Sequence, residues 1–304
     1  MRIPTGSIIA IALCLYNIPA IAQPLQLTPP QVIAQQSPEE EAEASLMRGY
    51  ELFQERTAES LPAAIPYLDK AATLYEQIGI DVGQAAALVL LGRVYSDLAE
   101  KQKALDYYNQ ALSIFQAVGY TSDDTLRDRR GEATTLSNIG VVYNALGESQ
   151  KALEYYNQAL PLRRAVGDRR GEATTLSNIG GVYSDLGENQ KALEYYNQAL
   201  PLRRAVGDRR GEAITLNNIG IVYNALGEKQ KALEYYNQAL PLRRAVGDRR
   251  GEAITLNNIG LVYSGLGEYQ KALDYFNQAL PISQAVGNPT LEATILGNIR
   301  NLQQ

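Results

Sequence analysis

One asparagine recurs every 40 residues through the second half of the chain, at Asn138, Asn178, Asn218 and Asn258, and Asn298 continues the series. A carboxamide carries both a hydrogen-bond donor and an acceptor, so it can pair with a peptide backbone irrespective of that peptide's sequence. A column of such groups on one surface predicts a binding site for an extended peptide segment. The alternative is that each asparagine bonds to a neighbouring helix of its own chain.

Groups that perform catalysis or bind metal are scarce in the sequence. The chain of 304 residues has no His, and its single Cys is Cys14. It contains no phosphate-binding loop, no Cys/His metal cluster and no nucleophile–base pair. The formal net charge of -5 is too modest to indicate nucleic acid as the main partner. We therefore expect no enzyme, no cofactor and no metal site.

The asparagine column belongs to an internal repeat, the segment Gly131–Arg170, which recurs with few changes. Its further copies begin at Gly171, Gly211 and Gly251, a diverged copy surrounds Gly92, a looser one covers about 42–80, and a partial one covers Leu291–Gln304. A repeat of this length is typical of helical arrays, in which each unit packs mainly on its neighbours. We expect six helical hairpins and one additional helix.

Two helical patterns make up each unit. The apolar arc of the first pattern contains Leu136, Ile139, Gly140, Tyr143 and Leu146. The second pattern has an arc of Ala152, Leu153, Tyr156, Ala159 and Leu160. Because these positions are three or four residues apart, each set lies on one face of a helix and predicts its core side.

The boundaries of these helices carry typical signals. Gly147 and Gly167 are placed to end the two helices in a left-handed conformation, and Asp168 is placed to cap the next one. Gly140 lies within the first helix, where we expect it to let the second helix pack closely. Pro161 lacks the N–H that an α-helix needs, so we expect the second helix to kink or break there. The same holds for the equivalent Pro201, Pro241 and Pro281.

The order Leu136, Ile139-Gly140, Tyr143, Gly147, Ala152, Tyr156 and Ala159 resembles the tetratricopeptide repeat signature. The unit is longer than the usual 34 residues. Together with the strings at Asn217–Gly220 and Asn257–Gly260, this resembles kinesin-light-chain arrays and bacterial arrays fused to CHAT protease domains, although no CHAT domain is present. The resemblance implies an all-α fold, a right-handed α-solenoid of stacked antiparallel hairpins, with ligands bound on an inner groove.

Differences between the copies indicate which face varies. Between 131 and 250 all changes fall in six columns, five of them on the first helix in an arc roughly opposite its core face. Residues such as Lys151, Glu154 and Arg163, which we expect to be exposed, do not change. We interpret the variable arc as a binding groove, and drift after duplication is the alternative. The predicted groove residues are Asn138, Asn178, Asn218, Asn258, Ser137, Ser177, Asn217, Asn257, Val141, Ile221, Leu261, Asn144, Ser184, Asn224 and Ser264.

Arginines gather at the end of each unit, where Arg163, Arg164, Arg169 and Arg170 surround Asp168 and precede Glu172. Opposite charges at this spacing favour ion pairs between helices. A surface for an anionic partner is the alternative.

The amino terminus has a different composition. Residues 1–22 combine Arg2, an apolar run and the small residues Ala20 and Ala22, which is typical of a cleaved secretory signal. Residues 23–38 are rich in Pro and Gln and predict a linker, so the array occupies 39–304. We expect export to the periplasm or the cell exterior after cleavage near Ala22, and no membrane span in the mature chain.

These features together predict an exported, non-catalytic scaffold that binds a protein or an extended peptide. Two alternatives stay open. Near-identical repeats could also associate end to end into a structural rod. The array could instead be the regulatory half of a protease whose CHAT-type domain is a separate chain.

Overall fold

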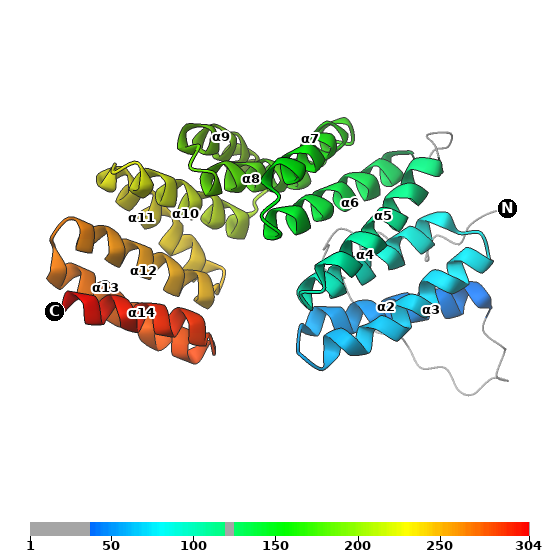
Figure 1. Cartoon of the computed structure of the whole chain (residues 1–304), viewed down its shortest axis with the longest axis horizontal. Coiled ribbons are helices and arrows are strands. Elements are labelled where there is room, and N and C mark those ends of the chain that lie inside the picture. The colour runs from blue at the N-terminus through cyan, green and yellow to red at the C-terminus, as the bar shows by residue number, and fades with distance from the viewer. Residues whose placement is uncertain (1–36, 119–124, 304) are drawn as a thin grey trace. The chain divides into compact units, whose positions relative to one another are not determined.

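The structure, a computed structural model, describes residues 37–118 and 125–303, and every regular element in these ranges is an α-helix. This confirms the all-α prediction. The helices, labelled in Figure 1, are α2 (Pro38–Glu55), α3 (Ser60–Gln77), α4 (Asp81–Asp97), α5 (Lys101–Ala117), α6 (Thr125–Ala145), α7 (Ser149–Ala165), α8 (Arg169–Asp185), α9 (Asn189–Ala205), α10 (Arg209–Ala225), α11 (Lys229–Ala245), α12 (Arg249–Gly265), α13 (Tyr269–Ala285) and α14 (Pro289–Leu302).

Consecutive helices pair into hairpins. In the described part of the chain the pairs are α2/α3, α4/α5, α6/α7, α8/α9, α10/α11 and α12/α13, and α14 packs on α13. We call the first helix of each pair the A helix and the second the B helix. A helices of neighbouring hairpins also contact one another, for example α4 with α6 and α10 with α12.

The described helices form two compact units, which divide after Gly167. The first unit contains α2 to α7, and its core includes Leu46, Phe53 and Tyr75. The second unit contains α8 to α14, where Tyr236, Phe276 and equivalent residues are buried. In both units the buried side chains come from the faces of the helices that their apolar spacing predicts.

A glycine of the A helix and a tyrosine of the B helix set how closely each hairpin packs. A Cβ atom added to Gly140 would lie 2.7 Å from Cε1 of Tyr156, which is closer than side chains approach. Tyr156 is 2% exposed. The expected role of Gly140 is therefore confirmed. Leu146 was expected in the same core arc but is 43% exposed, because it lies beyond the last residue of α6.

The predicted helix ends are also present. Gly147 and Gly167 have φ values of 79° and 65°, in the left-handed region that glycine adopts without strain. Asp168 accepts a hydrogen bond at Oδ1 from the N–H of Gly171, 2.9 Å away. At the first helix, Ser37 caps α2 and Pro38 is already helical, so α2 begins within the predicted linker.

The expectation that the B helices break at proline is wrong. Each of α7, α9, α11 and α13 continues as α-helix for four residues beyond its internal proline. The proline removes one backbone hydrogen bond, to the carbonyl of Asn157 in α7. Asn157 is exposed, so water can satisfy that carbonyl, while Leu160 and Arg163 on either side are buried and hold the helix in place.

The predicted signal and nearly all of the predicted linker lie outside the described residues. Within 37–118 and 125–303, no helix is both long enough and apolar enough to cross a bilayer.

Candidate functional site

Three apolar side chains of the predicted groove are exposed to solvent. Val141 on α6 is 44% exposed, Ile221 on α10 is 42% exposed and Leu261 on α12 is 40% exposed. They occupy one position of the repeat, which we call the variable column, and Gly181 occupies this position in α8. Apolar side chains that recur at one exposed position form a surface suited to a partner's side chains.

Polar groups flank the variable column on the same helix face. Asn138, Asn178, Asn218 and Asn258, the asparagine column, lie three residues earlier and are half-buried. Asn144, Ser184, Asn224 and Ser264 lie three residues later and are half-buried too. Positions three residues apart on a helix are surface neighbours, so α6, α10 and α12 each present amide, apolar and polar groups in one row.

The residue directly before each asparagine of the asparagine column was also predicted to line the groove. The structure contradicts this, because Ser137 is 7% exposed, Ser177 9%, Asn217 4% and Asn257 5%. Ser177, Asn217 and Asn257 contact the next A helix. Ser177 Oγ lies 3.4 Å from Thr215 Oγ1 of the next repeat, for example. A step of one residue turns the side chain by about 100°, from the open face to the contact between helices.

These buried residues orient the asparagine column at the end of the array. Asn258 donates from Nδ2 to Oδ1 of Asn217 at 3.3 Å, and Asn298 donates from Nδ2 to Oδ1 of Asn257 at 2.9 Å. With Nδ2 engaged, Asn258 and Asn298 keep their Oδ1 acceptors for a ligand. At these two positions the asparagine does bond to a neighbouring helix, as the alternative interpretation expected.

One repeat earlier, Asn218 contacts Tyr196 on α9. Burial raises the pKa of the Tyr196 phenol to about 12, and a hydrogen bond from the Asn218 side chain opposes that rise. Asn138 is different again, since its Nδ2 is buried without a hydrogen-bond partner among the described residues. The asparagines are therefore chemically unequal, although the sequence presents them as identical.

A cavity opens beside the variable column in the second unit. It has a volume of about 430 Å³ and lies between α12, α13 and α14. Leu261, Phe276 and Leu302 supply its apolar lining, and Asn298 and Ser264 supply polar groups. This combination suits a large apolar side chain whose backbone amide bonds to Oδ1 of Asn298.

A smaller cavity of about 120 Å³ lies in the first unit, between α4, α5 and α6. Arg93, Tyr108 and Asn138 line it at the repeat positions that Leu261, Phe276 and Asn298 occupy in the larger cavity. The two cavities are thus copies of one site. Sequence reasoning missed Arg93, although Arg93 follows Gly92 as Val141 follows Gly140, so the alignment of repeats could have found it.

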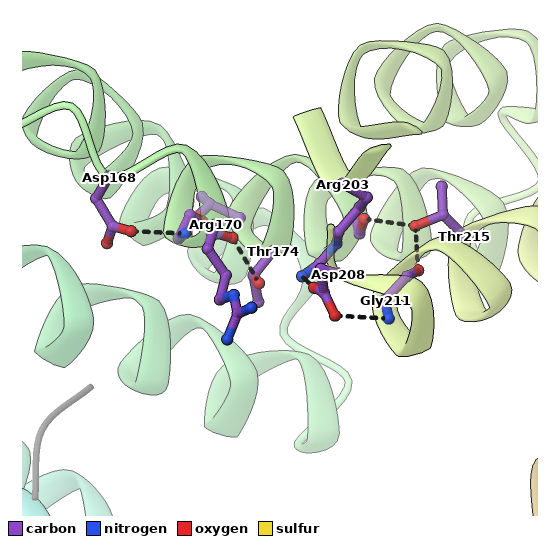
Figure 2. A network of polar contacts seen from close by, with 10 residues as sticks. Asp168, Arg170, Thr174, Arg203, Asp208, Gly211 and Thr215 are labelled. Atoms are coloured by element: carbon purple, nitrogen blue, oxygen red, sulfur yellow. Dashed lines mark hydrogen bonds and ion pairs between the residues drawn. The ribbon is translucent and has the colours of Figure 1, made fainter. Parts of the chain in front are cut away.

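The arginine clusters form ion pairs at the repeat junctions of the second unit. Arg203 pairs with Asp208, whose Oδ1 also accepts from the N–H of Gly211 (Figure 2). Arg243 and Asp248 repeat this arrangement. The predicted pairing is confirmed here. The expectation that Arg163 is exposed is wrong, because its side chain is buried and 7% of the residue is exposed.

Within the described residues no cluster of His, Cys, Asp and Glu is arranged to hold a metal ion. Burial raises the pKa of Tyr156 and Tyr236, whose rings pack in the core. The variable column and the asparagine column offer apolar contacts and hydrogen-bonding groups to a ligand.

A family described as Tetratricopeptide repeat matches residues 53–117, 131–205, 171–245 and 211–285. No curated protein matches the chain. Several solved structures have a similar fold, and three of them are described here. BtubC (BKLC) from P. vanneervenii is 22% identical with a TM-score of 0.59, over 81% of this chain and 92% of that one. The apo form of RapI is 18% identical with a TM-score of 0.67, over 86% of this chain and 97% of that one. NprR in complex with its cognate peptide NprX is 21% identical with a TM-score of 0.58, over 80% of this chain and 67% of that one.

Proposed function

The chain belongs to the tetratricopeptide repeat family, and we propose that it is an exported, non-catalytic scaffold that binds an extended segment of another protein on the open face of its A helices. The observation that carries this proposal is that Ile221 and Leu261 are exposed beside half-buried asparagines in the second unit, and that Val141 and Asn138 repeat this pattern in the first. Apolar groups give a ligand's side chains a place to pack, and carboxamides pair with its backbone.

The repetition of the site supports an extended ligand. An extended peptide presents side chains and amides at regular intervals, so it can contact equivalent groups on successive repeats. Variation within one column, from Val141 to Gly181 to Ile221, gives each repeat a different side-chain preference. The likeness of fold to NprR, whose structure holds its cognate peptide, is consistent with this mode of binding.

The test uses two matched double variants. Ile221→Glu with Leu261→Glu places charges in the variable column, where the native residues are 42% and 40% exposed. Leu226→Glu with Leu266→Glu is the control, because these residues are 41% and 43% exposed but lie at the ends of α10 and α12. Peptides selected by the native protein from a random 12-residue library are then measured against each variant.

We expect the groove variant to bind the selected peptides at least about tenfold more weakly, equivalent to about 1.4 kcal/mol, and the control to bind as the native protein does. Equal binding by both variants would place the site elsewhere. A loss in both variants, with unchanged circular dichroism, would also contradict a site confined to the variable column.

Export is a separate part of the proposal and rests on the composition of residues 1–22. Cell fractionation should recover the full chain outside the cytoplasm with a new amino terminus near Gln23. Deletion of residues 2–22 should retain it in the cytoplasm. An uncleaved chain in the cytoplasm would refute export without affecting the binding proposal.

A further inference from the structure

The helix α14 repeats the pattern of an A helix but has no B helix of its own within residues 37–118 and 125–303. It packs on α13 and α12 of the preceding hairpin. The face that other A helices turn toward their own B helix is therefore open on α14. Leu296 lies on this face and is 41% exposed, whereas the equivalent Leu256 of α12 is 1% exposed.

The open face of α14 is apolar at its centre. Ala293 is exposed and Ile299 is half-buried, although the equivalent Ala253 and Ile259 of α12 are buried. At 100° per residue these side chains and Leu296 lie within about 120° of arc, together with two charged residues. We call this set the end face, and its members are Glu292, Ala293, Leu296, Ile299 and Arg300.

A B helix of the repeat type does not fit the end face. In α12, a Cβ atom added to Gly260 would lie 2.5 Å from the ring of Phe276 on α13, so the packing requires glycine there. The equivalent residue of α14 is Arg300, whose side chain takes the place of such a ring. Arg300 is exposed, and none of the described residues forms an ion pair with it. A partner on this face has to accommodate an arginine, and a carboxylate is the group that pairs with it.

The end face is complementary to a second copy of itself. Glu292 and Arg300 lie four residues before and four residues after Leu296. When two α14 helices pack antiparallel about Leu296, Glu292 of one chain comes level with Arg300 of the other, and the symmetry repeats this pair. Each pair lies about 6 Å along the helix from the centre. Glu292 keeps one oxygen for it, because Gln284 donates to Oε1, at 2.9 Å, and leaves Oε2.

We propose that the end face of α14 binds the end face of a second copy, so that the protein forms a closed two-fold dimer. The two Leu296 side chains meet at the symmetry axis, and Ile299 of each chain packs near Ala293 of the other. Two pairs of Glu292 with Arg300 flank this apolar centre. The contact stops at two chains, because each copy covers the other's end face, whereas end-to-end stacking into a rod would continue.

Dimerisation through α14 leaves the A-helix groove open. Asn298 lies about 160° around the helix from Leu296, on the side where it bonds to Asn257 of α12. The dimer therefore presents two copies of the proposed peptide-binding face and can hold two segments of one ligand at once. The contact itself does not depend on peptide binding, because the end face contains none of the predicted groove residues.

The test measures the mass of the full chain in solution by sedimentation equilibrium over a range of concentrations. Leu296→Arg places a charge at the centre of the end face. Leu266→Arg is the matched control, because Leu266 is 43% exposed at the C-terminal end of α12, outside the end face. We expect the native chain and the control to reach twice the mass of one chain. Leu296→Arg should raise the dissociation constant of the dimer at least about tenfold.

Two single charge reversals test the antiparallel arrangement. Glu292→Arg and Arg300→Glu each bring like charges together in a dimer, so each should weaken self-association at least about tenfold. An equimolar mixture restores both ion pairs, because one chain then carries two arginines and the other carries two glutamates. We expect native mass spectrometry of the mixture to find mainly the heterodimer.

A native chain that stays monomeric at every concentration would overturn the proposal. A dimer that Leu296→Arg leaves as stable as the native one would overturn it too, since the contact would then lie elsewhere. If Leu296→Arg loses helicity by circular dichroism, the mixing experiment decides. A mixture that associates no better than either charge variant alone would refute the pairing of Glu292 with Arg300.

Discussion

Asn258 donates a hydrogen bond from its half-buried side chain to Oδ1 of the buried Asn217, 3.3 Å away in the preceding repeat. The same oxygen accepts from Thr255 Oγ1 at 3.2 Å. One repeat earlier, Ser177 meets Thr215 and has no carboxamide to offer. A single exchange of Ser for Asn between copies therefore adds a bond between repeats and changes which atom of the next asparagine faces outward.

Replacement Asn217→Ser tests this relationship with the residue that earlier repeats carry. We expect the fold to persist and the free energy of unfolding to fall by about 1 kcal/mol, the value of one hydrogen bond. The Nδ2 protons of Asn258 should exchange with solvent faster in nuclear magnetic resonance spectra. Unchanged exchange at Asn258, with accelerated exchange at Asn298, would show that the pairing is assigned to the wrong residues.

Stability at acid pH should depend on Asp248. Burial by itself raises the pKa of this carboxyl, but the N–H of Gly251 and the guanidinium of Arg243 outweigh burial and hold the pKa below its ordinary value of 3.8. A pKa lower in the folded than in the unfolded state stabilises the fold above pH 3.8, and this stabilisation is lost as the pH falls through the folded-state pKa.

Asp248→Asn should remove that part of the pH dependence. The free energy of unfolding near pH 7 should drop by about 3 kcal/mol, because Arg243 would remain buried without its ionic partner. Urea denaturation between pH 2 and pH 7 measures both effects. Exposed Glu234→Gln is the control. A variant whose stability falls with acid as steeply as that of the native protein would exclude Asp248 as a contributor.

Replacement by alanine should change the stability of the protein in opposite directions at the adjacent Gly180 and Gly181. A Cβ at Gly180 would lie 2.9 Å from the Tyr196 ring, so Gly180→Ala should destabilise the protein by about 1–3 kcal/mol through overpacking. At Gly181 the nearest atom is Tyr196 Oη at 3.7 Å, so Gly181→Ala should stabilise α8 by about 1 kcal/mol through helix propensity. Thermal melts measure both. Similar shifts in both variants would contradict close A–B packing at Gly180.

The prolines within the B helices should cost stability without directing the fold. Pro241 is exposed within α11, and the carbonyl of Asn237 lacks its helical donor there. We expect Pro241→Ala to raise the free energy of unfolding by about 1–3 kcal/mol, since proline is about 3 kcal/mol less favourable than alanine within a helix. A lower melting temperature would indicate that the proline shapes the packing of α11.

Much of the fold follows from the sequence. The 40-residue period and the apolar spacing predicted the paired helices, and the glycine, aspartate and tyrosine positions predicted where they end and how closely they pack. These predictions succeed because each depends on residues within one hairpin. Helical geometry relates their positions directly to sequence separation.

Only the tertiary structure decided which side chains of the variable arc face solvent. Ser177 and Asn178 are neighbours in sequence, but the A helix of the next repeat covers Ser177 and leaves Asn178 half-buried. For the same reason the sequence could not show that Asn258 is held by Asn217. Contacts between repeats decide which of these side chains are exposed and which are paired. They depend on how neighbouring hairpins approach one another, which periodicity within a single helix does not determine.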